Sequence, residues 1–441
     1  MAIDMAARAL ASDAQKMRYA IEAGFFTRPQ RPLVRIVHSR ALNQVTLGGG
    51  TTFEMLVEVA APFSRVQPIL SAGQNAGATA SSPAYFVRVA AVPNASKAAA
   101  DAATWQAVTM ATANYTPAPA INRSAWHVGA DMTLLPSVPR DDGGSGRLVL
   151  IRVYMGAGTV VLLGNGSDVF TNWAARSSRM FRWREQPGDF TTTNQAGFTS
   201  VTNTNRSPIA GLAYMPTDGR GVTLATSGDS NGVGSGETIG ANHIFLACEK
   251  LTQDTGVPYE YADVAWAGFA STAIRDRTID LFSTTGLFNA TTGLLPSAVH
   301  IPCATQNDWA QGPTVTTIDD ASVATMEANL SQARVVAARA GVPVIRSTWQ
   351  ASTARNWQAS DAVRRARNDR WRAECVANGD LMIDVASVID GPLNGNGQAI
   401  IKAIYDKDTA HYNDAGHLAV SALSRQAIMA AVPMPKGRLF A

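Results

Sequence analysis

The chain has 441 residues, of which 46% are hydrophobic and 16% charged, and its net charge is +3. Basic and acidic residues are nearly equal in number, which argues against nucleic-acid binding driven by phosphate neutralisation, because that binding needs a concentrated basic surface. The length allows two or three domains, and the apolar fraction excludes wholesale disorder. No apolar run reaches the ~18 residues that cross a bilayer, so we expect no membrane segment.

The first 29 residues are predicted to form a helical arm, because residues 3–25 have an amphipathic pattern that favours contact with a second copy of the chain. Asp4 and Arg8 interrupt its alanines, which is unlike a signal peptide. The three cysteines are far apart and match neither a disulfide framework nor a metal site. We therefore expect a cytoplasmic or particle-associated protein, although a leader outside this sequence would allow secretion.

Residues 30–215 have the pattern of a β-rich domain. In Phe53–Val59, the two glutamates fall on one face and the apolar residues at 53, 55, 57 and 59 on the other, which is typical of a half-buried strand. Runs rich in Gly, Pro, Asn and Ser separate this segment from further candidate strands at 34–37, 85–92, 147–154 and 159–163. Many short strands joined by turns predict a β-sandwich of the jelly-roll kind, serving as an accessory or carbohydrate-binding domain.

Residues 216–435 alternate between strand and helix patterns. The helices are predicted at 319–340 and 359–378, and the strands at 222–226, 261–266, 298–304, 342–347 and 381–385. Such alternation predicts a parallel sheet covered by helices on both faces, with ligands bound at the carboxyl ends of the strands. The arginines from Arg364 to Arg372 alternate with acidic residues, which predicts a solvated helix face.

The first of these carboxyl ends carries the segment Ser227–Gly234, in which Ser230 follows Gly228 and Asp229. A serine on a glycine-flanked turn between strand and helix is exposed near a helix N-terminus, as nucleophilic serines are. The Gly-Lys-Ser/Thr of a phosphate-binding loop is missing. Taken alone, the tripeptide favours an ordinary turn over a nucleophile.

Near the end of the chain, Asp408 precedes His411 by three residues. A carboxylate at this distance can accept the Nδ1–H bond of the imidazole and leave Nε2 free to take a serine proton. No histidine pair has the spacing of a helical zinc site, so we expect no metal. His417 is interpreted as the start of the last helix. The four other histidines are interpreted as structural: His38, His127, His243 and His300.

The C-terminal half resembles the SGNH, or GDSL-type, hydrolase family, because four separated blocks occur in the family's order. These are Gly228–Ser230 with Gly234, then Gly268 after the second strand, Asn307-Asp308 after the third, and Asp408-x-x-His411. The match covers about residues 221–432. It departs from the family at Thr305, where the third block usually has glycine.

The resemblance implies a flavodoxin-like α/β/α domain with a five-stranded parallel sheet. It assigns a catalytic triad to Ser230, His411 and Asp408, and an oxyanion hole to the Ser230 N–H, the Gly268 N–H and the Asn307 amide. Trp266 and Trp309 flank this site and are predicted to contact substrate, although core packing explains them equally well. No cofactor is implied.

These features predict a serine esterase acting on short acyl groups, most simply acetyl groups on a carbohydrate. Its partners would be an acylated small molecule or an acetylated glycan, with no nucleic acid and no membrane, and it would form a homo-oligomer through the helical arm. Two alternatives stay open: a non-enzymatic particle or surface protein with a vestigial hydrolase fold, and a lipase or thioesterase for longer acyl chains.

Overall fold

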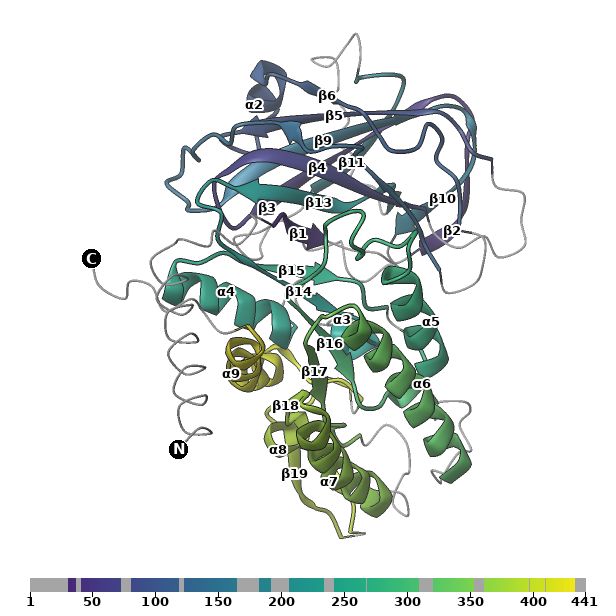
Figure 1. Cartoon of the computed structure of the whole chain (residues 1–441), viewed down its shortest axis with the longest axis vertical. Helices are drawn as coiled ribbons and strands as arrows, with labels where there is room; N and C mark the ends of the chain where they lie inside the picture. Colours follow the sequence, from purple (N-terminus) through teal and green to yellow (C-terminus); the bar gives the residue numbers. More distant parts are fainter. Residues whose placement is uncertain are drawn as a thin grey trace, which may run out of the picture.

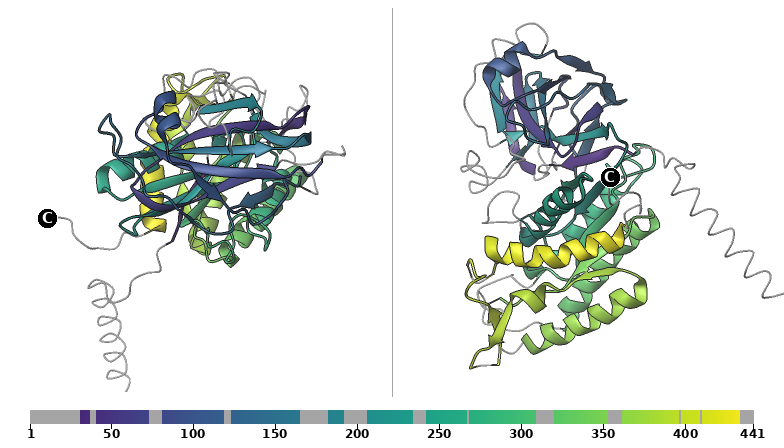
Figure 2. Two further views of the ribbon diagram at one scale, coloured as in Figure 1. Left: turned by 90° about the horizontal axis from the view of Figure 1, so that it is seen from above. Right: turned by 90° about the vertical axis from the view of Figure 1, so that its left-hand side faces the viewer.

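The computed structural model describes most of the chain: residues 31–36, 41–72, 81–118, 123–164, 182–191, 206–233, 242–266, 268–308, 320–352, 361–395, 397–408 and 410–432. The predicted helical arm at residues 1–29 lies outside them. A β-rich part stands on a part that mixes helices and strands, and the two are in contact in every view (Figures 1 and 2).

The β-rich part has two facing layers that enclose one apolar core. One layer is a five-stranded antiparallel sheet in the order β11-β3-β9-β5-β6, and helix α2 (Lys97–Ala102) packs near its edge. Three of its strands match predicted ones within two residues: β3 (Thr51–Val59), β5 (Tyr85–Val92) and β9 (Arg147–Met155). The other two, β6 (Gln106–Val108) and β11 (Arg182–Pro187), were not predicted.

The facing layer is formed by β4 (Phe63–Ala72), β13 (Ile209–Pro216) and a short three-stranded sheet. Its remaining strands are β2 (Ala41–Leu47), β7 (Ala125–Val128), β8 (Thr133–Leu134), β10 (Gly158–Gly164) and β12 (Arg206–Ser207). Phe53, Ile151 and Leu212, from strands of both layers, are fully buried between them.

The second part contains the predicted parallel strands, which pair in the order β15-β14-β16-β17-β18. They are β14 (Val222–Thr226), β15 (Tyr259–Asp263), β16 (Ala298–Pro302), β17 (Val344–Ser347) and β18 (Leu381–Ile383), and β19 (Asp390–Leu393) pairs with β20 (Ala399–Ile401). The helices are α3 (Ser230–Val233), α4 (His243–Thr255), α5 (Ser271–Leu281), α6 (Asp320–Arg339), α7 (Asp361–Asn378), α8 (Val385–Ile389) and α9 (Asp414–Ala431), with a 3₁₀ turn at Gln306–Asp308.

The sheet of the second part does not end at β15, which corrects the expectation of a separate five-stranded sheet. Strand β1 (Leu33–Ile36) pairs in parallel with β15, at Ile36 and Ala262, and antiparallel with β13. Ten strands therefore form one sheet, in the order β18-β17-β16-β14-β15-β1-β13-β4-β7, with β8 also paired to β4. A single sheet passes through both parts of the molecule.

Helices cover both faces of the parallel strands, and each face has its own core. On one face Ile244 of α4 and Val420 of α9 pack against the sheet, and on the other Ile274 of α5 and Met326 of α6 do so. Figure 1 shows these two helix pairs on opposite sides of β14–β17. The carboxyl ends of the strands consequently remain open between the helices, where ligands bind in sheets of this kind.

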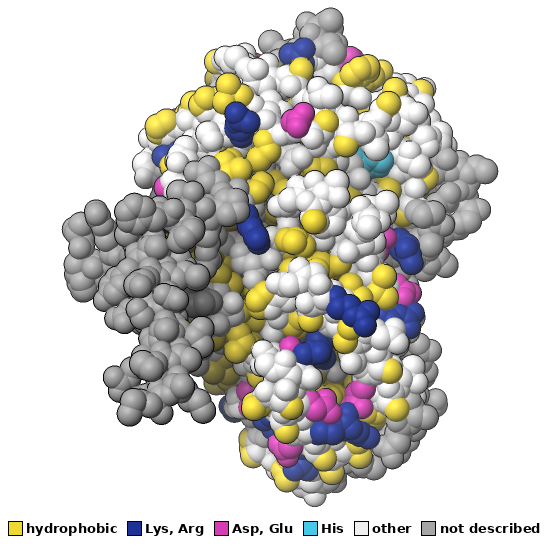
Figure 3. All heavy atoms as spheres, in the orientation of Figure 1, with side chains coloured by type: hydrophobic (Ala, Val, Ile, Leu, Met, Phe, Trp, Pro, Cys, Tyr) yellow, Lys and Arg dark blue, Asp and Glu magenta, His cyan; other side chains and the backbone are white. Residues whose placement is uncertain are grey.

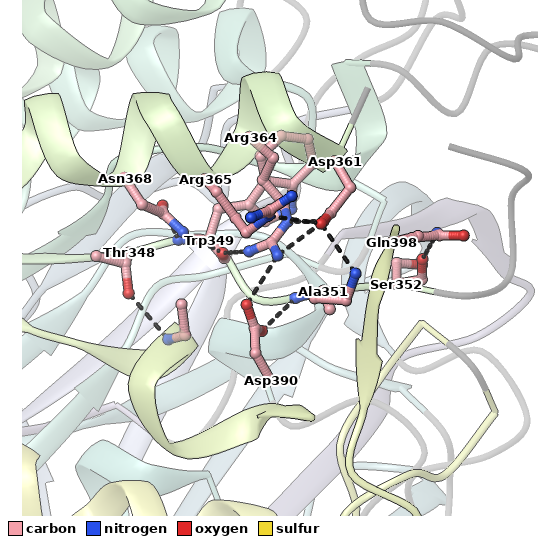
Figure 4. A network of polar contacts seen from close by, with 12 residues as sticks. Thr348, Trp349, Ala351, Ser352, Asp361, Arg364, Arg365, Asn368, Asp390 and Gln398 are labelled. Carbon is pink, nitrogen blue, oxygen red and sulfur yellow. Dashed lines mark hydrogen bonds and ion pairs between the residues drawn. The ribbon is translucent and has the colours of Figure 1, made fainter. Parts of the chain in front are cut away.

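On the arginine-rich helix α7, Arg364 is an exception to the predicted solvated face. Arg364 is 1% exposed, and its guanidinium donates to the carboxylates of Asp361 and Asp390, both at 2.8 Å, and to the Trp349 carbonyl (Figure 4). Two acidic partners, on α7 and β19, and a backbone carbonyl make burial of this cation tolerable. The alternating charges gave no sign that one arginine faces inward.

The surface carries no extended region of a single charge on the face drawn in Figure 3, where basic and acidic side chains lie next to each other over the lower helices. Within the described ranges, no helix is both long enough and apolar enough to cross a membrane.

Candidate active site

Ser230 is the first residue of α3, directly after the turn that leaves β14. Neighbouring strands hold this turn: the Ser227 N–H donates to the His300 carbonyl at 2.9 Å, and the Trp266 N–H donates to the Gly228 carbonyl at 3.0 Å. The Asn231 N–H donates to Asp229 Oδ1 at 3.1 Å. Burial raises the pKa of Asp229, while its hydrogen bonds to Thr305 and to backbone N–H groups oppose that shift. Asp229 thus supports the turn, as expected.

His411 lies beside Ser230, although 180 residues separate them in the sequence. His411 Nε2 is 2.8 Å from Ser230 Oγ, and His411 Nδ1 is 2.8 Å from Asp408 Oδ2. The Asp408 carboxylate also accepts the backbone N–H of His411 at 2.8 Å, which fixes the loop in one turn. The structure therefore brings the three predicted triad residues into one hydrogen-bonded chain.

The partners of His411 determine its tautomer. Burial disfavours the charge on Asp408, but hydrogen bonds from the His411 side chain and backbone outweigh it, so the pKa of that carboxyl lies below its usual value. An ionised carboxylate only accepts hydrogen bonds, so the proton is on Nδ1 and Nε2 can accept the Ser230 hydroxyl. With 24% of the His411 side chain exposed, the relay is open to solvent on one side.

Gly268 and Asn307 lie on adjacent loops that are tied together. The Phe269 N–H donates to the Trp266 carbonyl at 3.2 Å and closes a turn. In this turn Gly268 has φ +84°, a backbone conformation that is strained in any residue with a side chain. Asn307 Nδ2 donates to the Phe269 carbonyl at 2.9 Å. Since an amide carries two hydrogens, Asn307 keeps a second donor for an oxyanion.

Two side chains of the third block have roles that the sequence did not indicate. Asp308 accepts the Ser271 N–H at 3.0 Å and the Ser271 hydroxyl at 2.7 Å, so it fixes the first turn of α5 to the block. Gln306 donates to the Ala410 carbonyl at 3.0 Å and ties the block to the histidine loop. A bond to a carbonyl 104 residues away leaves no sequence signal.

The predicted substrate contact of Trp266 is wrong. Trp266 is 6% exposed, its ring centroid lies 4.5 Å from that of Phe269, and the Arg277 guanidinium covers it at 4.9 Å. It therefore belongs to the core on the α5 side, because a large aromatic ring gains most when it is removed from water. Trp309 and Gly234 lie outside the described residues.

The other described histidines support the structure, as expected. His127 bonds Thr112 and the Thr116 carbonyl in the β-rich part. His243, His300 and His417 are buried close to the candidate site, with ring centroids 5.6 Å apart for His243 and His300 and 6.1 Å for His243 and His417. His417 is the fourth residue of α9 rather than its first. Among the residues described, no group of His, Cys, Asp or Glu could hold a metal ion.

This histidine cluster predicts instability in acid. Burial lowers the pKa of His243 to about 3, and it also lowers the pKa values of His300 and His417. Below pH ~6.5 these histidines bind protons in the unfolded chain but not in the folded chain, so the free energy of unfolding decreases as the pH falls. For His243 alone we expect a loss of about 2 kcal/mol between pH 7.5 and 5.0.

Urea unfolding of the wild type and of His243→Asn at both pH values measures this loss. Asparagine keeps a polar partner for Ser424, which bonds His243 Nδ1 at 2.8 Å, but it does not titrate. We expect the stability difference between the two pH values to be smaller in the variant by about 2 kcal/mol. Equal differences in the two proteins would contradict the assignment.

Comparison with known proteins identifies similar folds. No family model and no curated protein matches the chain. Among solved structures, it is similar to a GDSL-like lipase from Bacteroides thetaiotaomicron, with 19% identity over 47% of this chain and 88% of the other and a TM-score of 0.34. An acetyl xylan esterase shares 18% identity over 47% of this chain and 100% of its own, with a TM-score of 0.35.

A third similar structure spans both parts of the chain. It is a carbohydrate esterase family 2 enzyme with a carbohydrate binding domain from Corynascus thermopiles (Myceliophthora fergusii), with 14% identity over 92% of this chain and 99% of the other and a TM-score of 0.36. The chain is thus similar to a solved GDSL-like lipase and to solved carbohydrate-active esterases, at low identity.

Proposed function

We propose that the protein is a serine esterase that works through an acyl-enzyme. The observation that carries this proposal is the continuous chain from Ser230 Oγ to His411 Nε2 and from His411 Nδ1 to Asp408, with 2.8 Å at each step. In a vestigial fold, no function would require these three side chains to stay aligned through hydrogen bonds. The geometry thus favours the enzyme over the non-enzymatic alternative.

The reaction begins when Ser230 Oγ attacks the ester carbonyl carbon and its proton passes to His411 Nε2. Asp408 stabilises the imidazolium that forms. The oxyanion accepts bonds from the Ser230 N–H, the Gly268 N–H and the Asn307 amide, and each such donor typically contributes about 10²–10³ in rate. The intermediate then collapses as His411 protonates the leaving alcohol.

The second half repeats these steps with water. His411 takes a proton from the attacking water, a second oxyanion forms at the same donors, and its collapse returns the proton to Ser230 Oγ and releases the acid. Every proton is moved by side chains of this chain, so the scheme uses no cofactor and no metal.

The substrate we propose is a short acyl ester, most simply an acetyl group on a carbohydrate. A small, partly open cavity beside the nucleophile turn, lined among others by Asn231, Gln306, Trp349 and Tyr412, is the place where we propose that the acyl group binds. We also propose that residues 30–215 are a sandwich-like accessory domain for an SGNH-type domain at 216–435.

The test of the catalytic proposal is covalent labelling. Incubation with a fluorophosphonate should add one phosphonyl group to the intact protein, located at Ser230 by peptide mass spectrometry, and Ser230→Ala should stay unlabelled. Ser387→Ala, which changes an exposed serine that bonds the Asp384 carbonyl, is the matched control and should label fully. An unlabelled wild type would favour the vestigial fold.

Substrate class is tested separately with p-nitrophenyl esters of increasing chain length and with acetylated glycans. We expect kcat/KM to be highest for acetate and to fall with each added carbon. A maximum at eight or more carbons would favour a lipase or thioesterase.

A further inference from the structure

Thr305 occupies the position where the resembled family has glycine, and its hydroxyl lies at the junction of all three site loops. Thr305 is 1% exposed. Its Oγ1 donates to the Phe269 carbonyl at 3.1 Å and accepts the Asn307 backbone N–H at 3.1 Å. The same hydroxyl also lies beside the Asp229 carboxyl group, next to the nucleophile, and helps to lower the pKa of that carboxyl, so its single proton is shared between the Phe269 carbonyl and Asp229.

These bonds reach the loops that carry each oxyanion donor. Phe269 follows Gly268, Asn307 carries the amide donor, and Asp229 precedes Ser230. The Phe269 carbonyl accepts both Thr305 Oγ1 and Asn307 Nδ2, so the Gly268 turn and the Asn307 side chain share one anchor. A glycine at 305 has no side chain and could make none of these contacts.

We propose, on the basis of the proposed esterase function, that Thr305 is a positioning residue whose buried hydroxyl aligns the Gly268 N–H and the Asn307 amide with Ser230 in the transition state. It does not touch the reacting atoms. A misaligned donor weakens binding of the oxyanion, which exists only after attack, and leaves binding of the neutral ester almost unchanged.

The test compares Thr305→Val, which keeps the shape and removes the hydroxyl, with Thr305→Ser, which keeps the hydroxyl. With p-nitrophenyl acetate, we expect valine to lower kcat by about 10–100-fold with KM within about threefold of the wild type. Serine should restore most of the rate. Thr305→Ala removes the same hydroxyl with less steric change and replaces the valine variant if that protein is insoluble.

Thr252→Val is the matched control. Thr252 Oγ1 also donates to a backbone carbonyl, that of Cys248, at 2.9 Å and accepts a backbone N–H, that of Tyr259, at 2.9 Å, but it lies at the end of α4. We expect a similar loss of thermal stability in both valine variants and a loss of kcat only at position 305.

The outcomes separate the two proposals. If the wild type is active, an unchanged kcat in Thr305→Val would overturn the role of Thr305 and leave the esterase proposal intact. The same conclusion follows if Thr305→Ser is as slow as Thr305→Val. A wild type with neither turnover nor fluorophosphonate labelling would overturn the esterase itself. Equal losses of kcat at 252 and 305 would reduce Thr305 to a general stability effect.

Discussion

Replacement of His411 by alanine is expected to lower kcat for p-nitrophenyl acetate by about 10⁴–10⁶-fold. His411 Nε2 is the base 2.8 Å from Ser230 Oγ, and without it the hydroxyl must lose its proton to water. The oxyanion donors remain, so some rate above that of the uncatalysed reaction should persist. Steady-state kinetics with active-site titration measures the loss.

Asp408→Asn tests the same relay from its other end. An asparagine can present its N–H group to Nδ1, which favours the tautomer with a proton on Nε2 and removes the base, so we expect a fall in kcat of about 10⁴-fold. Asp414→Asn, in the first turn of α9, changes a nearby carboxylate and should keep nearly full activity. A fall of less than tenfold in both His411→Ala and Asp408→Asn would rule out the triad.

The candidate triad could be predicted because its chemistry leaves local marks. Asp408 and His411 are three residues apart, and Ser230 follows a Gly-Asp pair at a strand end. The packing of Trp266 could not be read in the same way, because an aromatic residue near a strand end can face either the core or the opening. Trp266 faces the core because its ring packs against Phe269 and Arg277, and Arg277 is eleven residues away on α5.

The fold shows the same division between local and distant causes. The five parallel strands and helices α6 and α7 were predicted to within a few residues, because hydrophobic periodicity is local; α6 spans Asp320–Arg339, one residue inside the predicted range at each end. The pairing of β1 with β15 joins residues more than 220 positions apart. Nothing in Leu33–Ile36 alone indicates that it pairs with both β13 and β15, because an apolar strand of four residues would be buried beside any partner strand.

This shared sheet bears on whether the C-terminal half can fold alone. Glu260 on β15 is 0% exposed, and its carboxylate accepts the Ala60 N–H at 2.6 Å and the Tyr214 hydroxyl at 2.7 Å. Arg35 lies 3.8 Å from it. All three of these partners belong to the N-terminal half, so that half pairs this buried carboxylate.

A second set of contacts joins the halves further along the sheet. The Ser124 N–H donates to the Asp280 carboxylate at 3.2 Å, and Arg277 donates to the Ser124 hydroxyl at 2.6 Å. The core on the α5 side also contains fully buried side chains of the N-terminal half: Val34, Ile36, Ile69 and Leu163. At about 1.5–3 kcal/mol each, these four contribute roughly 6–12 kcal/mol, comparable with the whole stability of a typical domain.

We therefore expect a fragment of residues 216–441 to be unfolded or insoluble and to lack esterase activity. Removal of β1 turns β15 into an open edge strand, and removal of Val34, Ile36, Ile69 and Leu163 exposes an apolar surface that then favours aggregation. Circular dichroism, thermal unfolding and fluorophosphonate labelling of the purified fragment measure this. A chain without residues 1–29 keeps every contact named above and is the matched control. A fragment that unfolds cooperatively and labels like the full chain would show that the two halves are independent domains, and that the continuous sheet adds little to the stability of the active site.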